Sequence, residues 1–227
     1  AVSVDLAAGT AGAATGISGT VSGITRVVGS AYADTFTDGD AGDTYEGLAG
    51  DDTYIFGDDW GTDTIIDTAG NDSVSFAPGA NGVAIDFTDS LGSLVANDGG
   101  ASQLNAASIE TVEGSAGDDV FTAQLGETVN ADVLGGAGND RFVVETGSDF
   151  AGSVDGGADE DTIDYSAQFG NIDRSAGSPN FSGSLAGIEK VQHPLTVPNG
   201  LTSVVGLIQD GVDATVGAVE IPLLGNI

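Results

Sequence analysis

The sequence contains no cysteine and no methionine, and it has no long apolar run. Without cysteine, disulfides and thiolate metal sites are excluded, so rigidity must come from packing or from ions bound through oxygen. Without methionine, even at its first residue, the chain is expected to be a processed or excised product. No apolar stretch approaches the roughly 20 residues that a helix needs to cross a bilayer, so we expect no membrane span.

Basic residues are also scarce: 4 of them face 35 acidic residues, for a formal net charge of −31. Nucleic acid and anionic membranes are therefore poor partners, because binding to either requires a basic surface. A folded chain with this charge repels itself unless a cation relieves the repulsion, and a divalent metal is the natural partner. The chain has 37 glycines and 40% hydrophobic residues, evenly mixed, which predicts many short strands and tight turns with few helices.

A nine-residue spacing of aspartates organises the first part of the chain. Asp34, Asp43 and Asp52 are nine residues apart, and Asp63 and Asp72 continue the series after one longer interval. Turns and strands alternate in this pattern, because small residues precede most of these aspartates and an apolar residue follows two positions later. The residues expected to point inward are Phe36, Tyr45, Tyr54, Ile65 and Val74.

A second array of aspartates has a longer period. Asp119, Asp140 and Asp161 are spaced by 21 residues, and a weaker unit is centred on Asp149. Each full coil is therefore expected to be longer than in the first array, with the additional residues inserted at the corners.

A larger repeat is superimposed on these arrays. Residues 2–6 resemble residues 83–87, and residues 170–173 are a degraded third copy. A matching strand follows each copy, next to Ile24, Ile109 or Ile188. The spacing predicts one solenoid over residues 1–192, made of modules at about 1–81 and 82–168 and a truncated module at 169–192.

The last segment, residues 193–227, has a different pattern. Apolar residues between Leu201 and Val219 are spaced by three and four positions, which predicts a short C-terminal helix that ends before Pro222. We expect this apolar tail to act as a cap or as an assembly segment, so self-assembly into an oligomer or filament is expected.

One stretch carries a specific motif. Residues 135–143 read Gly-Gly-Ala-Gly-Asn-Asp-Arg-Phe-Val and match the calcium-binding repeat Gly-Gly-x-Gly-x-Asp-x-U-x, in which U is a large apolar residue. Residues 29–36, 47–54 and 156–163 resemble it with glycines lost. The chain therefore resembles the RTX (repeats-in-toxin), or hemolysin-type, calcium-binding repeat family, including bacterial surface-layer and extracellular matrix members. The resemblance implies an all-β fold, a right-handed parallel β-roll or β-solenoid, that binds several calcium ions.

The chemistry of the motif fits calcium. A glycine-rich turn can direct its carbonyl oxygens inward, and a terminal aspartate adds a carboxylate, which suits an ion that takes about six to eight oxygens. By the resemblance, alternate turns share an edge, so Asp34, Asp52 and Asp72 stack together. The other expected stacks are Asp43 with Asp63, and Asp119 with Asp140 and Asp161. The predicted ligands are these eight aspartates with Asp149, and the carbonyl groups of Gly47, Ala49, Gly135 and Ala137.

Other interpretations of single residues remain open. The aspartates could be ordinary solvated turn residues, and this is the favoured interpretation for Asp5, Asp86 and Asp173, which no glycine turn precedes. Trp60, with Tyr45 and Tyr54, could form a sugar-stacking surface, although the two tyrosines occupy inward positions typical of core. His193 has no paired carboxylate or serine motif beside it, so catalysis is not expected.

These patterns favour a non-enzymatic extracellular protein, exported by a type I secretion system and stabilised by calcium. It would serve as a surface-layer, matrix, adhesin or filament subunit. One alternative is an excised folding and secretion module of a larger type I-secreted enzyme or toxin. Another is a carbohydrate-binding module that uses Trp60.

Overall fold

The structure, a computed structural model, describes residues 1–13, 18–20, 22–39, 41–168 and 183–192. Every helix or strand assigned in these residues is a β-strand, which confirms the predicted all-β class. The described part therefore contains no helix of the length and apolarity needed for a membrane crossing. The predicted helix between Leu201 and Val219, the repeat copy at residues 170–173 and His193 lie outside the described residues.

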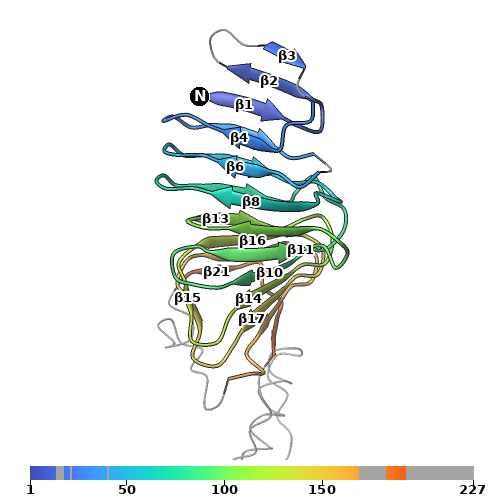
Figure 1. The fold of residues 1–227 in the computed structure, drawn as a ribbon. Helices are drawn as coiled ribbons and strands as arrows, with labels where there is room; N and C mark the ends of the chain where they lie inside the picture. The colour runs from blue at the N-terminus through green and yellow to red at the C-terminus, as the bar shows by residue number, and fades with distance from the viewer. Residues whose placement is uncertain (14–17, 21, 40, 169–182, 193–227) are drawn as a thin grey trace, which may run out of the picture. The chain divides into compact units, whose positions relative to one another are not determined.

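The described strands form two ten-stranded sheets and one short sheet (Figure 1). Sheet A contains β1 (Val2–Asp5), β2 (Thr10–Ala13), β3 (Ser18–Thr20), β5 (Thr35–Thr37), β7 (Thr53–Ile55), β9 (Ser73–Ser75), β13 (Thr111–Glu113), β16 (Asp132–Ala137), β19 (Val154–Ala158) and β21 (Leu185–Ala186). Sheet B contains β4 (Arg26–Val28), β6 (Thr44–Glu46), β8 (Thr62–Ile66), β10 (Ala84–Phe87), β11 (Leu94–Asn97), β12 (Gln103–Ala106), β14 (Val120–Ala123), β17 (Arg141–Val144), β20 (Thr162–Asp164) and β22 (Lys190–Gln192). Sheet C pairs β15 (Thr128–Val129) with β18 (Asp149–Phe150).

In the first array the chain alternates between sheets A and B, so every second strand stacks in parallel. β5 pairs with β7, which places Phe36 opposite Tyr54, and β6 pairs with β8, which places Tyr45 opposite Ile65. Each nine-residue unit is therefore half a coil, as the resemblance to the RTX repeats implied. The residues expected to point inward are buried: Phe36, Tyr45, Tyr54, Ile65 and Val74 are each at most 2% exposed.

Identical registers stack aromatic rings along the core. Phe36 and Tyr54 have ring centroids 5.1 Å apart, and Phe121 and Phe142 have centroids 5.0 Å apart, with nearly parallel planes in both pairs. Burial of each such ring contributes roughly 1.5–3 kcal/mol through the hydrophobic effect, and stacking adds about 0.5–1.5 kcal/mol. The nine-residue and 21-residue periods therefore fix the core as well as the turns.

The longer coils of the second array have a third strand. Between β14 and β16 the chain forms β15 (Figure 1), and between β17 and β19 it forms β18, so sheet C is built from the inserted residues. This confirms the expected corner insertions. Asp149 opens β18 opposite Thr128, so it belongs to sheet C and not to a stack of turn aspartates.

Antiparallel strands interrupt the predicted parallel roll at two places, a feature that the sequence analysis did not predict. β1, β2 and β3 form one antiparallel meander, and β10, β11 and β12 form another. Reversal is possible at short connections that contain Gly9 and Gly92, whose φ angles are 63° and 77°. The parallel strands β5 and β7 and the antiparallel strands β10 and β11 show the same alternation of buried and partly buried residues, so the pattern alone could not show this feature.

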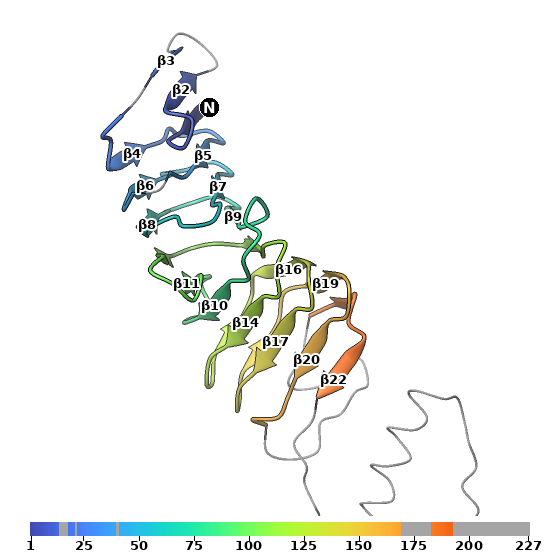
Figure 2. The ribbon, with the colours of Figure 1, turned by 90° about the vertical axis from the view of Figure 1, so that its right-hand side faces the viewer.

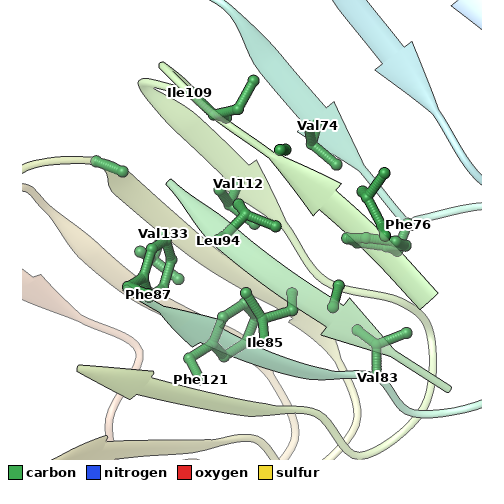
Figure 3. Close-up of a cluster of buried hydrophobic side chains, with 14 of the residues drawn as sticks. Val74, Phe76, Val83, Ile85, Phe87, Leu94, Ile109, Val112, Phe121 and Val133 are labelled. Carbon is green, nitrogen blue, oxygen red and sulfur yellow. The ribbon is translucent and has the colours of Figure 1, made fainter. Parts of the chain in front are cut away.

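The second meander joins the two arrays. In sheet B, β12 pairs in parallel with β8 and β10 pairs in parallel with β14, whereas in sheet A β13 pairs directly with β9. Figure 3 shows the resulting core: Val74, Val112 and Val133 of sheet A lie with Ile85, Phe87 and Leu94 of the meander. One continuous hydrophobic core therefore runs through the junction.

This junction gives a stability prediction. Leu104 of β12 is fully buried, so Leu104→Ala should lower the free energy of unfolding by about 2–5 kcal/mol, through lost apolar burial and the remaining cavity. Leu91→Ala, at a side chain that is 73% exposed, is the matched control and should change it by less than about 0.5 kcal/mol. Urea unfolding in calcium measures both. Equal losses of unfolding free energy in the two variants would show that Leu104 of the meander does not contribute to the core.

Candidate metal centre

The turn aspartates lie at the edge of the core because of strand alternation. In the segment Asp52-Thr53-Tyr54, residues 52 and 54 point inward and Thr53 points outward, since residues two apart share a face of a strand. The same spacing places each of the following side chains inside, with at most 4% exposure: Asp34, Asp43, Asp52, Asp63, Asp72, Asp119, Asp140 and Asp161.

Three of these aspartates form a ladder at the edge of sheet A. The Asp34 N–H donates to Asp52 Oδ1 at 2.7 Å, and the Asp52 N–H donates to Asp72 Oδ1 at 2.8 Å. At the amino-terminal end of the ladder the Val2 N–H donates to Asp34 Oδ1 at 2.5 Å. At its other end the Asp72 N–H donates to Glu110 Oε2 at 2.7 Å. Each carboxylate thus receives a hydrogen bond from the preceding coil. We call this set, Asp34 to Glu110, the sheet A ladder.

A second ladder at the edge of sheet B repeats this geometry. Asp119 N–H donates to Asp140 Oδ1, and Asp140 N–H donates to Asp161 Oδ1, both at 2.8 Å. Val83 N–H donates to Asp119 Oδ1 at 2.6 Å, and Asp161 N–H donates to Glu189 Oε2 at 2.9 Å. We call this set, Asp119 to Glu189, the sheet B ladder.

The remaining stack joins Asp43 and Asp63. The Asp43 N–H donates to Asp63 Oδ1 at 2.5 Å. All three predicted stacks are therefore confirmed as stacks, while the role of their members as metal ligands stays a prediction. The sequence interpretation missed Glu110 and Glu189, which end the two ladders; the repeated tripeptide apolar-Glu-(Thr/Lys) at 109–111 and 188–190 was the available signal.

Several of the stacked turn aspartates have one carboxylate oxygen that is buried without a hydrogen-bond partner. Among the described residues this holds for one carboxylate oxygen of each of Asp43, Asp52, Asp63, Asp72, Asp140 and Asp161. A buried polar atom without a partner costs about 1–3 kcal/mol, and more when it is charged. These oxygens therefore require either a proton or a cation.

The glycines of the turns allow further oxygens to approach. A Cβ atom at Gly135 would overlap both Asp140 Oδ2 and the carbonyl oxygen of Gly156. The same pair of contacts, a ladder carboxylate and the carbonyl oxygen of the next coil, surrounds the Cα atoms of Gly29, Gly114 and Gly156. At these turns side-chain and main-chain oxygens thus occupy the space that the Cβ atom of any residue other than glycine would fill.

Two aspartates that the sequence interpretation missed complete acidic triads. Asp38 has a carboxylate oxygen within 4.8 Å of one from Asp43 and one from Asp63, and Asp67 does the same with Asp52 and Asp72. Asp38 and Asp67 stand at the first position of their six-residue turns, where the motif has glycine. An acidic residue at this position was the signal that could have identified them.

Tyrosine hydroxyls hold these two additional carboxylates. Tyr45 Oη–H donates to Asp38 Oδ1 at 2.6 Å, and Tyr54 Oη–H donates to Asp67 Oδ2 at 2.5 Å. Since both rings are buried in the core, each tyrosine fixes its partner from the inside. One carboxylate of each triad is therefore hydrogen-bonded to a side chain of the hydrophobic core.

Burial changes the protonation of the triads and ladders. It raises the pKa of Asp52 to about 6 and the pKa values of Asp63 and Asp72 to about 7. The pKa of Asp140 also rises to about 7, again mainly through burial. Burial together with the charges of Asp63 and Asp43 raises the pKa of Asp38 to about 8, despite the opposing hydrogen bond from Tyr45.

The donor set fits calcium. Carboxylate and carbonyl oxygens surround the ladders, and calcium accepts about six to eight oxygens in loose geometry. Zinc would favour nitrogen or sulfur ligands, and the chain has no cysteine. Ions between stacked turns would be held by consecutive ladder aspartates and by carbonyl groups of the intervening turns, and the triads would add Asp38 and Asp67.

The four main-chain carbonyl groups predicted as ligands do not all lie beside the ladder oxygens. The carbonyl oxygens of Gly47 and Gly135 lie beside Gly29 and Gly114 of the preceding coil, where ladder oxygens converge. Ala49 lies in the turn before Asp52, and Ala137 is the last residue of β16, paired with Ala158.

The residues assigned to ordinary turns behave differently from the ladder residues. Asp5 accepts a hydrogen bond from Ala8 N–H at 2.7 Å and so closes a local turn. Asp86 lies within β10 at a half-buried position. Neither residue belongs to the acidic triads, and Asp173 lies outside the described residues.

Trp60 belongs to the core. Its side chain is 1% exposed, with ring centroids 6.3 Å from Phe56 and 5.1 Å from Phe76. Tyr45 and Tyr54 are fully buried as well. The alternative prediction of a sugar-stacking surface on these three rings is therefore wrong, because none of them is exposed.

Comparison with known proteins agrees with this geometry. The family model for the RTX calcium-binding nonapeptide repeat matches four segments, residues 20–54, 58–75, 107–127 and 134–169. These segments contain every aspartate of the ladders and triads. Searches of the curated proteins and of the solved structures find no significant match. The resemblance inferred from residues 135–143 is confirmed.

The glycine contacts predict a strong effect of one methyl group. Gly135→Ala should weaken calcium binding at least tenfold, because its Cβ atom would displace Asp140 Oδ2 and the carbonyl oxygen of Gly156. Gly57→Ala is the matched control, since a Cβ atom there meets no atom within 4 Å. Calorimetric calcium titration compares the two. Similar affinities would contradict the proposed position of the ion.

The raised pKa values predict an unusual pH dependence for the calcium-free chain. Between about pH 4 and pH 7 the folded state retains protons that the unfolded chain has released, so its stability falls as pH rises. In a chelator, circular dichroism should therefore show more β-structure near pH 5 than near pH 8. Asp140→Asn should reduce this difference, because it removes one of the titrating groups. A chelated chain that is more folded near pH 8 would refute the assignment.

Proposed function

We propose that this chain, an RTX calcium-binding repeat protein, is a non-enzymatic structural element of the bacterial exterior. It serves as a subunit of a surface layer, matrix, adhesin or filament, and its roll has the right-handed coil of that family. One observation carries the proposal: the buried carboxylates with unpartnered oxygens form ladders along the coil edges, not a single cleft. Such an arrangement binds ions and stabilises a scaffold.

Calcium binding would couple to folding. Ladder carboxylates repel one another and are buried, so the calcium-free roll is opposed by both desolvation and like charge. Each ion adds two positive charges to a chain of formal charge −31. Because the ions bind the folded state, their binding free energy becomes folding free energy. Export of an unfolded chain by a type I system, followed by folding in calcium outside the cell, is consistent with this coupling.

The environments of the carboxylates argue against hydrolysis. Glycoside hydrolysis uses two carboxyl groups whose pKa values are pushed apart, so that one acts as an acid and the other as a base. Here burial raises the pKa values of two consecutive carboxyl groups of one ladder in the same direction, Asp52 to about 6 and Asp72 to about 7. These stacked carboxyl groups are therefore not divided into an acid and a base, and their repetition along the coil edge suits ion binding.

The repeat match also favours a second function. The matched RTX repeats are typical of type I-secreted extracellular proteins. Under this alternative the chain is the calcium-dependent folding module of a larger protein. The gene from which the chain is expressed distinguishes the two, because the module requires an adjoining catalytic or toxin domain.

Calcium-dependent folding and assembly test the proposal. Circular dichroism should show loss of most β-structure in a chelator and cooperative recovery in calcium but not in magnesium. Sedimentation in calcium should show oligomers or filaments of the full chain, as a structural subunit requires. An unchanged spectrum after exhaustive chelation would contradict calcium-driven folding, and a persistent monomer at high concentration would contradict the structural role.

A pair of adjacent substitutions provides the control. Asp52→Asn keeps the acceptor for the Asp34 N–H but removes a buried charge, so it should weaken calcium binding. Asp51→Asn removes the same charge from the neighbouring exposed side chain and should leave binding nearly unchanged.

A further inference from the structure

The internal repeat contains a junction that occurs twice in the described residues. At the first, β12 and β13 pair in parallel with β8 and β9, the last two strands of the first array. The Asp72 carbonyl accepts hydrogen bonds from the N–H groups of Glu110 and Thr111, each at 3.0 Å. The strands β12 and β13 thus cover the last coil of the first array, one in each sheet.

The second junction has the same construction. β21 and β22 pair in parallel with β19 and β20. The Asp161 carbonyl accepts hydrogen bonds from Glu189 and Lys190 N–H, at 3.2 and 2.9 Å. Glu110 and Glu189 therefore have equivalent positions, and each junction covers the end of one ladder.

The strands β3 and β4 hold the equivalent position in the first module. β1 corresponds to β10, because each pairs in parallel with the strand four elements later. In addition, Val2 at the start of β1 and Val83 just before β10 each donate a main-chain N–H to a ladder aspartate. After each of them comes an antiparallel meander and then the strand β4 or β13. The sheets are exchanged between the modules, since β1 lies in sheet A and β10 in sheet B.

The outer edges of β3 and β4 have no partner strand among the described residues. β3 is the last strand of sheet A and β4 is the last strand of sheet B, at the amino-terminal end of the stack (Figure 2). At the two internal junctions the corresponding edges are covered by β8 with β9 and by β19 with β20. The backbone groups of this open edge are available to another strand pair.

An exposed apolar residue marks the same position. Ile24 is 43% exposed, whereas its equivalent at the first junction, Ile109, is 1% exposed. The equivalent at the second junction, Ile188, is partly buried and packs against the core. The apolar residue is thus present at all three positions, but only the two covered junctions bury it.

We propose that the open edge of β3 and β4 docks the last coil of another roll module, of the type that β8 and β9 form here. The N–H groups of Thr25 and Arg26 would donate to the carbonyl of the last turn aspartate of that module, and Ile24 would become buried. Thr25 stands in place of Glu110, so a hydroxyl replaces the carboxylate at this contact. The module would precede β1 in the same polypeptide, as at the internal junction.

A designed duplication tests the docking edge. Residues 1–81 are repeated directly ahead of Ala1 in the full chain, so that Asn81 joins Ala1 as it naturally joins Gly82. Hydrogen exchange is followed by mass spectrometry on the peptide 22–28 in calcium. In the unmodified chain this peptide should exchange rapidly. In the extended chain half of its signal, from the inner copy, should become protected, while the peptide 108–113 stays protected in both chains.

A substitution separates docking from general stabilisation. Ile24→Asp in the inner copy should abolish the new protection, whereas Ile24→Asp in the outer copy should leave it intact. Rapid exchange of the whole 22–28 signal in the extended chain overturns the proposal. So does an extended chain whose added module gains no β-structure in calcium, because docking requires both modules to fold.

Discussion

The fold depends on carboxylates that are buried at the edges of the coils. Each ladder aspartate uses one oxygen to accept the N–H of the preceding coil, which sets the stacking register. In Asp52, Asp72, Asp140 and Asp161 the other oxygen is buried without a donor. The first interaction is satisfied by the chain, and the second requires a proton or a cation. The same side chain therefore couples the register of the strands to the pH and the cation concentration of the solution.

The glycine-rich turns are the geometric counterpart of this constraint. Stacked coils bring carbonyl and carboxylate oxygens so close to Cα atoms such as that of Gly135 that no side chain fits there. Where aspartate replaces the first glycine, at Asp38 and Asp67, a buried tyrosine hydroxyl holds the added carboxylate. Loss of a motif glycine can therefore add an acidic oxygen to the turn.

Much of this protein was determined by the sequence alone. The spacing of Asp34, Asp52 and Asp72, with an inward residue two positions later, predicted alternating turns and strands and the buried face, because a strand has a period of two residues. The half-coil and the stacking of alternate turns were implied by the resemblance to the RTX repeats. The 21-residue spacing of Asp119 and Asp140 predicted longer coils. The motif at residues 135–143 predicted the family.

Only the tertiary structure decided how the two arrays are joined and which further residues reach the ladders. The meander of β10 to β12 places β12 beside β8 through antiparallel pairing, and an alternating pattern carries no information about strand direction. Glu110 and Asp72 are 38 residues apart, and Asp67 meets Asp52 across two turns. Such contacts depend on which coils stack, and stacking is a property of the assembled sheets and not of any local segment.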